Sequence, residues 1–182
     1  MRLYYETARL QLRILTSAYA SQVLQFYLDN QDFFNPWEPD RVKLFYTKDF
    51  HKANLIFEYN EIVKMHFLRF WIFEKSNPEK IIGCVCFQNF QKGSLMNCTI
   101  GYKIDKNHTQ CGFATEALSK AIEILFDDQK FHRIEALIHP ENIASIRLIE
   151  KLNFEFEGIA KSSIRLDNVW YDHLRYALIN PY

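Results

Sequence analysis

A short segment rich in small residues, 109–117 (Thr-Gln-Cys-Gly-Phe-Ala-Thr-Glu-Ala), stands between a strand-like stretch and an amphipathic stretch. Gly112 lets the main chain approach a ligand closely, and the first N–H groups of the helix that follows have no partner within it. With the helix dipole, those N–H groups attract an anion such as a pyrophosphate. Taken alone, the segment favours a plain strand-to-helix turn with Thr115 and Glu116 near the helix start. It is neither a Walker loop nor a dinucleotide fingerprint, because no Gly-Lys-Ser/Thr follows and it holds one glycine.

A second segment, 140–154, joins a strand-like stretch to another amphipathic stretch. Asn142 is of a type that caps helices, and Ser145 follows in the expected first turn. Taken alone, these two residues indicate a helix cap and an exposed side chain. Cys111 lies near a helix start, which could lower the pKa of its thiol and make it reactive, but a nucleophilic role for it is not favoured.

The elements expected around these segments follow from periodicity and turn signals. Strands are expected at 9–15, 67–73, 81–87, 134–138, 154–164 and 170–179, and a further strand is expected to end near residue 105. Helices are expected from Thr16 or Ser17 to about residue 28, and at 48–64, 114–126 and 144–152. Polar breaks at 75–80 and 91–94 predict an antiparallel meander of three strands. Residues 30–40 contain Pro-Trp-Glu-Pro and predict an ordered, non-helical loop. The order β-α-α-β-β-β-α-β-α-β-β predicts a single α+β domain over 1–182.

Composition narrows the class of protein. The chain carries 22 Lys and Arg against 22 Asp and Glu, which argues against direct nucleic-acid binding, since that binding depends on clustered cations. The cysteines (Cys84, Cys86, Cys98, Cys111) form no C-x-x-C pair, and His108, His132, His139 and His173 show no metal spacing, so no metal is expected. Cys84 and Cys86 would pack into the core from one strand face. No signal-peptide or membrane-spanning run is seen, which predicts a cytoplasmic protein that does not engage membranes.

In combination, the two segments resemble the signatures of the GNAT superfamily, the GCN5-related N-acetyltransferases. The first resembles the family's pyrophosphate loop, and Asn-Ile-Ala-Ser (142–145) followed by Glu-Lys-Leu-Asn-Phe (150–154) resembles its second signature. The resemblance runs over nearly the whole chain. It implies a mostly antiparallel sheet that splays in the middle, where acetyl-CoA enters as co-substrate.

The resemblance also implies roles for individual residues. The strand edge at Tyr102, Lys103 and Ile104 would bind the pantetheine arm, and an N–H on that strand would stabilise the oxyanion. The pyrophosphate would be held by six residues of the loop and of the helix start: Gln110, Cys111, Gly112, Phe113, Ala114 and Thr115. Asn142 would also bind the cofactor. Ser145 is the candidate acid that protonates the departing thiolate, although that thiolate leaves readily without much help.

Within the superfamily, residues 6–13, 35–39 and 170–176 resemble the Rim-type branch, which acetylates the N-terminal amines of ribosomal proteins, notably on alanine. This resemblance implies a protein N-terminus as acceptor. Separately, the chain is expected to be a monomer or a homodimer. Trp37 and Glu38 would line the acceptor site, with a satellite hydrophobic cluster as the structural alternative. A small-molecule amine acetyltransferase is the nearest alternative function, and a non-catalytic acyl-CoA-binding module is another.

Three positions depart from the family pattern. Thr109 and Gln110 stand where Arg or Gln and then Gly often open the loop. Thr99 stands where many members carry an acidic base, two positions before Gly-Tyr. Asn153 replaces the glycine of Lys-Leu-Gly-Phe, a modest change because Asn tolerates the left-handed conformation.

Overall fold

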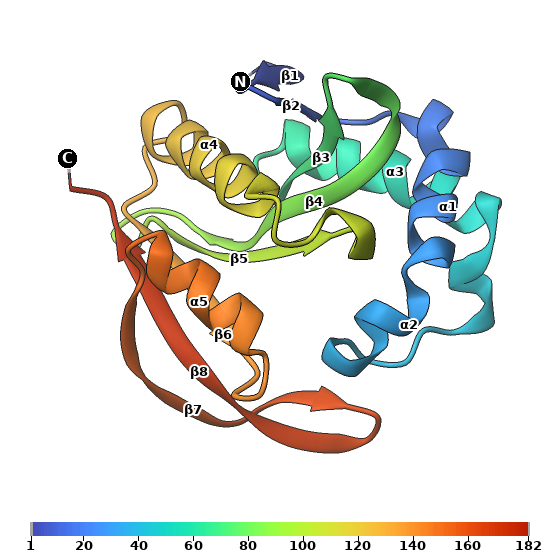
Figure 1. The fold of residues 1–182 in the computed structure, drawn as a ribbon. Helices are drawn as coiled ribbons and strands as arrows, with labels where there is room; N and C mark the ends of the chain where they lie inside the picture. Colours follow the sequence, from blue (N-terminus) through green and yellow to red (C-terminus); the bar gives the residue numbers. More distant parts are fainter. Residues whose placement is uncertain (1, 182) are drawn as a thin grey trace.

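One mixed sheet organises the chain. The computed structural model describes residues 2–181, in which eight strands follow the order β1-β2-β3-β4-β5-β6-β8-β7 (Figure 1). The strands are β1 (Tyr4–Glu6), β2 (Leu10–Arg13), β3 (Leu68–Glu74), β4 (Asn77–Gln91), β5 (Asn97–Ile104), β6 (Arg133–Ile138), β7 (Glu155–Leu166) and β8 (Val169–Ile179). Neighbouring strands are antiparallel except β5 and β6, which run parallel. The expected α+β class, mostly antiparallel, is confirmed, as is the meander of β3, β4 and β5.

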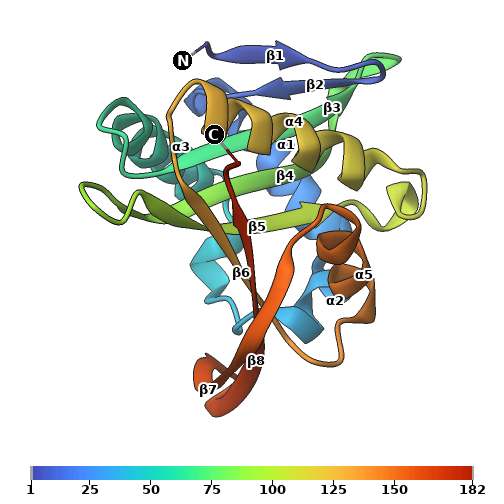
Figure 2. The ribbon, with the colours of Figure 1, turned by 90° about the vertical axis from the view of Figure 1, so that its left-hand side faces the viewer.

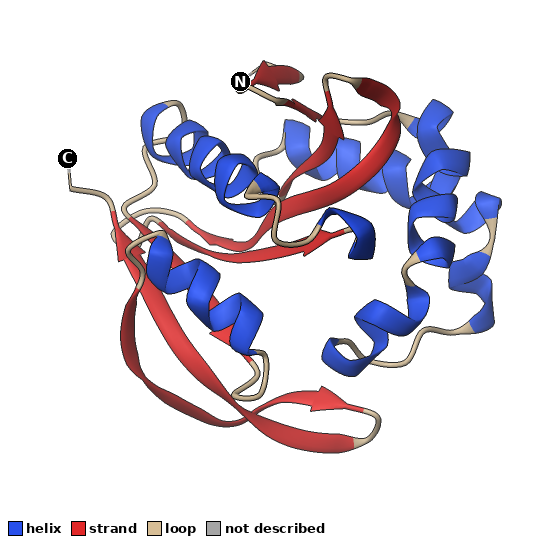
Figure 3. Cartoon of the chain, viewed as in Figure 1, coloured by secondary structure: helices blue, strands red, loops and turns tan. Residues whose placement is uncertain are grey.

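Helices cover both faces of the sheet (Figure 3). The α-helices are α1 (Ala20–Asp29), α2 (Gln31–Phe34), α3 (Lys48–Val63), α4 (Phe113–Asp127) and α5 (Ile143–Lys151), and the 3-10 helices are η1 (Ser17–Tyr19), η2 (Asn35–Trp37), η3 (Lys43–Tyr46) and η4 (Lys106–His108). Helix α4 lies over one face of β3 to β5, while α1 and α3 lie over the opposite face (Figure 1).

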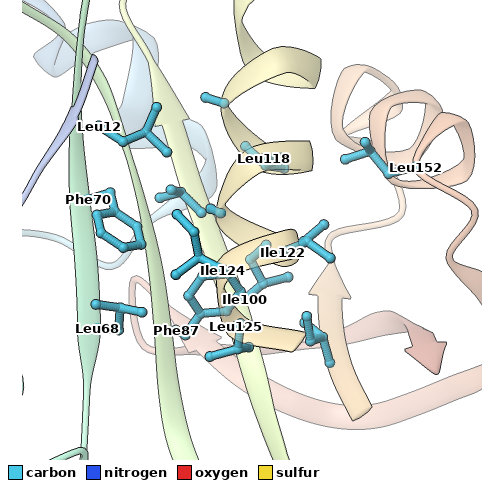
Figure 4. Close-up of a cluster of buried hydrophobic side chains, with 14 of the residues drawn as sticks. Leu12, Leu68, Phe70, Phe87, Ile100, Leu118, Ile122, Ile124, Leu125 and Leu152 are labelled. Carbon is cyan, nitrogen blue, oxygen red and sulfur yellow. The ribbon is translucent and has the colours of Figure 1, made fainter. Parts of the chain in front are cut away.

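Strand alternation sends side chains into two cores. Leu12, Phe70 and Ile100 face α4, where they meet Leu118 and Leu125 in the larger core (Figure 4). On the opposite face, Trp71, Phe73 and Cys84 pack with α1 and α3 in a second core. Cys84 is buried as expected, whereas Cys86 is half-buried. Because burial of apolar area drives folding, these two layers fix the sheet between the helices.

The sheet divides between β5 and β6. These strands pair over three positions, with Asn97, Cys98 and Thr99 opposite Arg133, Ile134 and Glu135. Strand β6 pairs with β8 along its whole length, and beyond Thr99 strand β5 keeps β4 as its neighbour among the described residues. The two strands diverge visibly in Figure 2. The expected splay is therefore present, and it leaves main-chain groups of 100–104 facing the opening.

The prediction of a non-helical loop at 30–40 was wrong. Helix α2 and the 3-10 helix η2 occupy residues 31–37. Pro36 lies in the first turn of η2, where its missing N–H needs no helical partner and its fixed φ suits a helix start. The proline therefore permits the short helix that the Pro-Trp-Glu-Pro run argues against.

Several boundaries also differ. Strand β1 was missed; it is three residues long and pairs antiparallel with β2. The expected turn at 75–80 is tighter because β4 already begins at Asn77, with register irregularities opposite Phe73 and Glu74. Thr16 precedes a 3-10 turn and makes no capping hydrogen bond there, so the first helix begins irregularly. Within residues 2–181, no helix has the length and apolar character that a membrane crossing needs.

Candidate active site

The loop before α4 has a backbone shaped by two left-handed residues. Gln110 has φ +59 and Gly112 has φ +78, and α4 begins at Phe113. No side chain of the described residues caps this helix end, so the first N–H groups of α4 stay available to a ligand. Cys111 is exposed, and its thiol lies 3.3 Å from the Thr109 carbonyl oxygen. The loop therefore presents main-chain N–H donors at the N-terminus of α4, which is the positive end of the helix dipole.

An arginine ties this loop to the β1–β2 turn. Arg9 Nε lies 2.7 Å from Glu116 Oε2, Arg9 Nη1 donates to the Cys111 carbonyl at 3.0 Å, and the guanidinium stacks 4.5 Å from the Phe113 ring centre. Although burial raises the pKa of Glu116, hydrogen bonds from Thr7 and Arg9 hold it below its ordinary value. Arg9 thus balances the negative charge of Glu116 beside the loop. Sequence reasoning missed Arg9, because its partners lie over 100 residues away.

The diverging strand β5 presents alternate side chains to opposite faces. Tyr102 and Ile104 pack against the larger core, and Tyr102 donates its hydroxyl to the Ser145 carbonyl oxygen at 3.3 Å. Burial raises the pKa of Tyr102 to about 12, so it stays protonated. This bond connects β5 to α5 across the splay. Lys103 points to the opposite face, where it forms an ion pair with Glu38.

Helix α5 begins at the far side of the splay. Asn142 Oδ1 accepts a hydrogen bond from the Ser145 N–H at 3.1 Å, so the capping role expected of Asn142 is confirmed. The cap fixes the first turn of α5 and, with it, the half-buried Ser145 beside Tyr102.

An aromatic cluster lies on the opposite face of the sheet, between η2 and β8. The Trp37 ring centre lies 5.8 Å from His139, which in turn lies 5.2 Å from Tyr171 and 5.6 Å from His173. Trp37 is 38% exposed and His173 is 4% exposed. Burial lowers the pKa of His173, which favours a neutral ring. The cluster forms a stiff aromatic wall. The sequence contains its members at separate positions and did not predict that they lie together.

Glu38 has partners that the sequence did not reveal. Its carboxylate pairs with Lys103 and with Arg41 Nη2 at 2.9 Å. Burial pushes the pKa of Glu38 upward, but Lys103 and Arg41 outweigh it and hold that pKa below its ordinary value. Burial in turn disfavours charge on Lys103, while Tyr27 and Glu38 raise its pKa. The pair fixes the end of η2 to β5.

We expect Glu38→Ala to lower the free energy of unfolding at neutral pH by about 3 kcal/mol, because Lys103 loses its carboxylate in a largely buried site. The folded pKa of Glu38 is lowered, so this contribution is complete above its unfolded pKa and disappears as pH falls through the folded value. Urea unfolding of both proteins at several pH values measures the difference.

The control for that measurement is Glu123→Ala, which removes an exposed partner of Lys120. This variant should change stability by only about 0.5 kcal/mol. Equal, small effects of both substitutions would contradict a buried role for the pair of Glu38 and Lys103.

Comparison with known proteins decides the family. A family model described as an acetyltransferase (GNAT) domain matches residues 9–155. The chain belongs to the GNAT family. Among the described residues of this GNAT protein, no group of three or more His, Cys, Asp or Glu side chains is arranged to hold a metal ion.

Individual relatives agree with the GNAT assignment. The chain is 35% identical over 89% of its length to "Probable N-acetyltransferase YjcK" of Bacillus subtilis (strain 168), of which 89% is covered. It is 33% identical over 96% of its length to the [ribosomal protein uS5]-alanine N-acetyltransferase of Escherichia coli (strain K12), of which 90% is covered. Mycobacterium smegmatis RimJ in complex with CoA-disulfide superposes with a TM-score of 0.87 at 27% identity, over 93% of this chain and 81% of that one. The GNAT protein is therefore an amine acetyltransferase with Rim-type relatives.

Proposed function

We propose that this enzyme transfers the acetyl group of acetyl-CoA to the N-terminal amine of a protein, with alanine or serine first, and that it acts in the cytoplasm. The observation that carries the acceptor class is the similarity to the uS5-alanine enzyme across 96% of the chain. The relative YjcK, of comparable identity, carries no acceptor in its name, so the acceptor must be tested directly.

The loop before α4 fits a coenzyme A pyrophosphate. It offers main-chain donors at a helix N-terminus, and Arg9 neutralises Glu116, a carboxylate of the first turn that would repel phosphate. In this proposal Gln110 to Thr115 hold the pyrophosphate, and the free edge of β5 at Tyr102 to Ile104 binds the pantetheine arm by main-chain hydrogen bonds. Asn142 supports this binding by fixing the start of α5.

Bound acetyl-CoA supplies a thioester carbonyl, which an amine attacks directly. The chain contributes orientation and an N–H of β5 near the carbonyl oxygen. The aromatic wall of Trp37, His139 and Tyr171 would line the acceptor entrance. Glu38 would act there indirectly, because its carboxylate already binds Lys103 and Arg41.

Ser145 is proposed as the acid near the thiolate. We expect Ser145→Ala to lower kcat about tenfold, because a thiolate leaves readily and orientation supplies most of the rate. Turnover at saturating acetyl-CoA measures the loss, and Ser119→Ala, exposed on α4, is the matched control with unchanged turnover. A loss beyond about a thousandfold would make Ser145 central to the chemistry instead.

The function itself is tested by incubating the enzyme and labelled acetyl-CoA with a ribosome fraction and with free polyamines. Mass spectrometry should find the label on the N-terminus of one or a few proteins. Label on polyamines alone would move the enzyme to the small-amine class, and absence of label with intact CoA binding would make it a non-catalytic module.

A further inference from the structure

A buried asparagine lies where α1 ends and α2 begins. Asn30 is 0% exposed, and its amide makes three hydrogen bonds. Its Nδ2 donates to the Phe26 carbonyl at 2.9 Å and to Asp105 Oδ2 at 3.1 Å, and its Oδ1 accepts the Lys106 N–H at 2.8 Å. The junction between α1 and α2, which we call the joint, is therefore hydrogen-bonded directly to the residues that follow β5. The chain leads from this joint into η2.

Asp105 is the other half of this joint. It is 1% exposed and caps η4 by accepting the Asn107 N–H at 2.9 Å. It also lies 2.7 Å from His108 Nδ1 and 3.8 Å from Lys80 Nζ. Burial raises the pKa of Asp105, but the bonds from His108 and Asn30 outweigh burial and keep that pKa below its ordinary value. A carboxylate with so many donors holds the main chain around it in one arrangement.

From Asp105 the contacts continue into the loop before α4. His108 Nε2 lies 3.1 Å from Glu74 Oε1 at the end of β3, and its ring centre lies 6.3 Å from that of Phe113. His108 is followed directly by the loop segment 109–112. The same buried carboxylate therefore borders the chain that leads to the loop and, through Asn30, the chain that leads to Trp37.

We infer that Asn30 and Asp105 are positioning residues that set the cofactor loop and the acceptor wall in one geometry. The inference rests on the proposed function. Neither side chain is exposed enough to touch a substrate, so both act through η4 and η2. Since acyl transfer requires the thioester and the amine to meet within a narrow range, a shared anchor for both binding segments affects both substrates.

The experiment uses Asn30→Ala, because this residue belongs to the acceptor side of the joint. We expect the Kd for CoA, measured by calorimetry without acceptor, to rise about tenfold, and the KM for an acceptor peptide to rise about as much, from misplacement of both segments. Asn54→Ala on α3 is the matched control, since it also removes an amide-to-carboxylate hydrogen bond, to Glu58 at 2.8 Å. Circular dichroism at the assay temperature confirms that each variant is folded.

A charge swap sharpens the test. Asn30→Asp alone sets two carboxylates against each other and should be the most damaging single change, whereas Asn30→Asp with Asp105→Asn again faces an amide with a carboxylate. Because the swap leaves the Phe26 carbonyl without the Nδ2 donor of Asn30, we expect the double variant to recover part of the CoA affinity and of the acceptor KM that Asn30→Asp alone loses. Recovery of these two values while Tm stays below that of the wild type is a readout that restored stability alone would not give.

The inference is overturned if Asn30→Ala lowers Tm yet keeps the wild-type Kd for CoA and the wild-type KM, since the joint would then serve stability only. It is also overturned if the wild-type protein binds no CoA. If the wild type binds CoA but acetylates no amine, the proposed function fails separately, while the calorimetric comparison still decides whether Asn30 sets the cofactor loop.

Discussion

Gly112→Val should weaken CoA binding by at least about a hundredfold, which corresponds to the loss of one or two charge-assisted main-chain hydrogen bonds. Gly112 has φ +78, a region that a β-branched residue adopts only with strain, and an added Cβ would lie 3.3 Å from Arg9 Nη2. The side chain would also stand where the phosphates approach the backbone. Calorimetric titration with CoA measures the change.

Gly93→Val provides the matched control for this experiment. Gly93 has a nearly equal φ of +71, and an added Cβ there meets nothing within 4 Å. It carries the same backbone strain at a turn that lies outside the candidate site. We expect it to lose stability and keep its CoA affinity. Unchanged affinity in a folded Gly112→Val protein would show that the loop is an ordinary turn and that the cofactor assignment is wrong.

The second large effect concerns the acceptor. Near pH 7.4 about a quarter of an α-amino group is unprotonated, against about one part in a thousand of a lysine side chain, a difference of over two hundredfold. Thr99 offers no carboxylate to deprotonate an amine, and Glu38 is already bound to two cations. A site with so little help for proton removal should prefer the amine that is already free.

Peptides beginning with Ala or Ser should therefore be acetylated about a hundredfold faster than the same peptides blocked at the N-terminus and carrying an internal lysine. Tandem mass spectrometry locates the acetyl group, and initial rates on the two peptide sets give the ratio. Efficient acetylation of lysine or polyamines would refute the N-terminal assignment while leaving acetyl-CoA as donor, and another group or a water chain would then have to take the proton.

Local signals in the sequence predicted much of this fold. The spacing of apolar residues located α3, α4 and the meander, and the residue type of Asn142 predicted its cap, because each depends on neighbours within a few positions. The same local rules fail at 31–37, because a proline predicts the end of a helix in a helix interior but fits well in a first turn.

The candidate site was predictable only in part. The loop around Gly112 carries its signal in adjacent residues. Lys103 lies 65 positions from its partner Glu38, and Asp105 lies 75 positions from its partner Asn30, so these two bonds exist only once β5 has packed beside α1 and η2. Likewise, Trp37 meets His139 and Tyr171 through the fold and through no pattern in the chain. Long-range polar contacts of this kind have no periodicity to detect.

The three paired positions between β5 and β6 also divide the molecule mechanically. The first five strands and the last three are joined by this short ladder, by the larger core around α4, and by the bond from Tyr102 to Ser145. We expect the main-chain bonds of so short a ladder to open at a lower free energy than the whole protein unfolds. We therefore expect local opening of the native state to concentrate at this seam, where a ligand that bridges both strands would take the place of the missing part of the ladder.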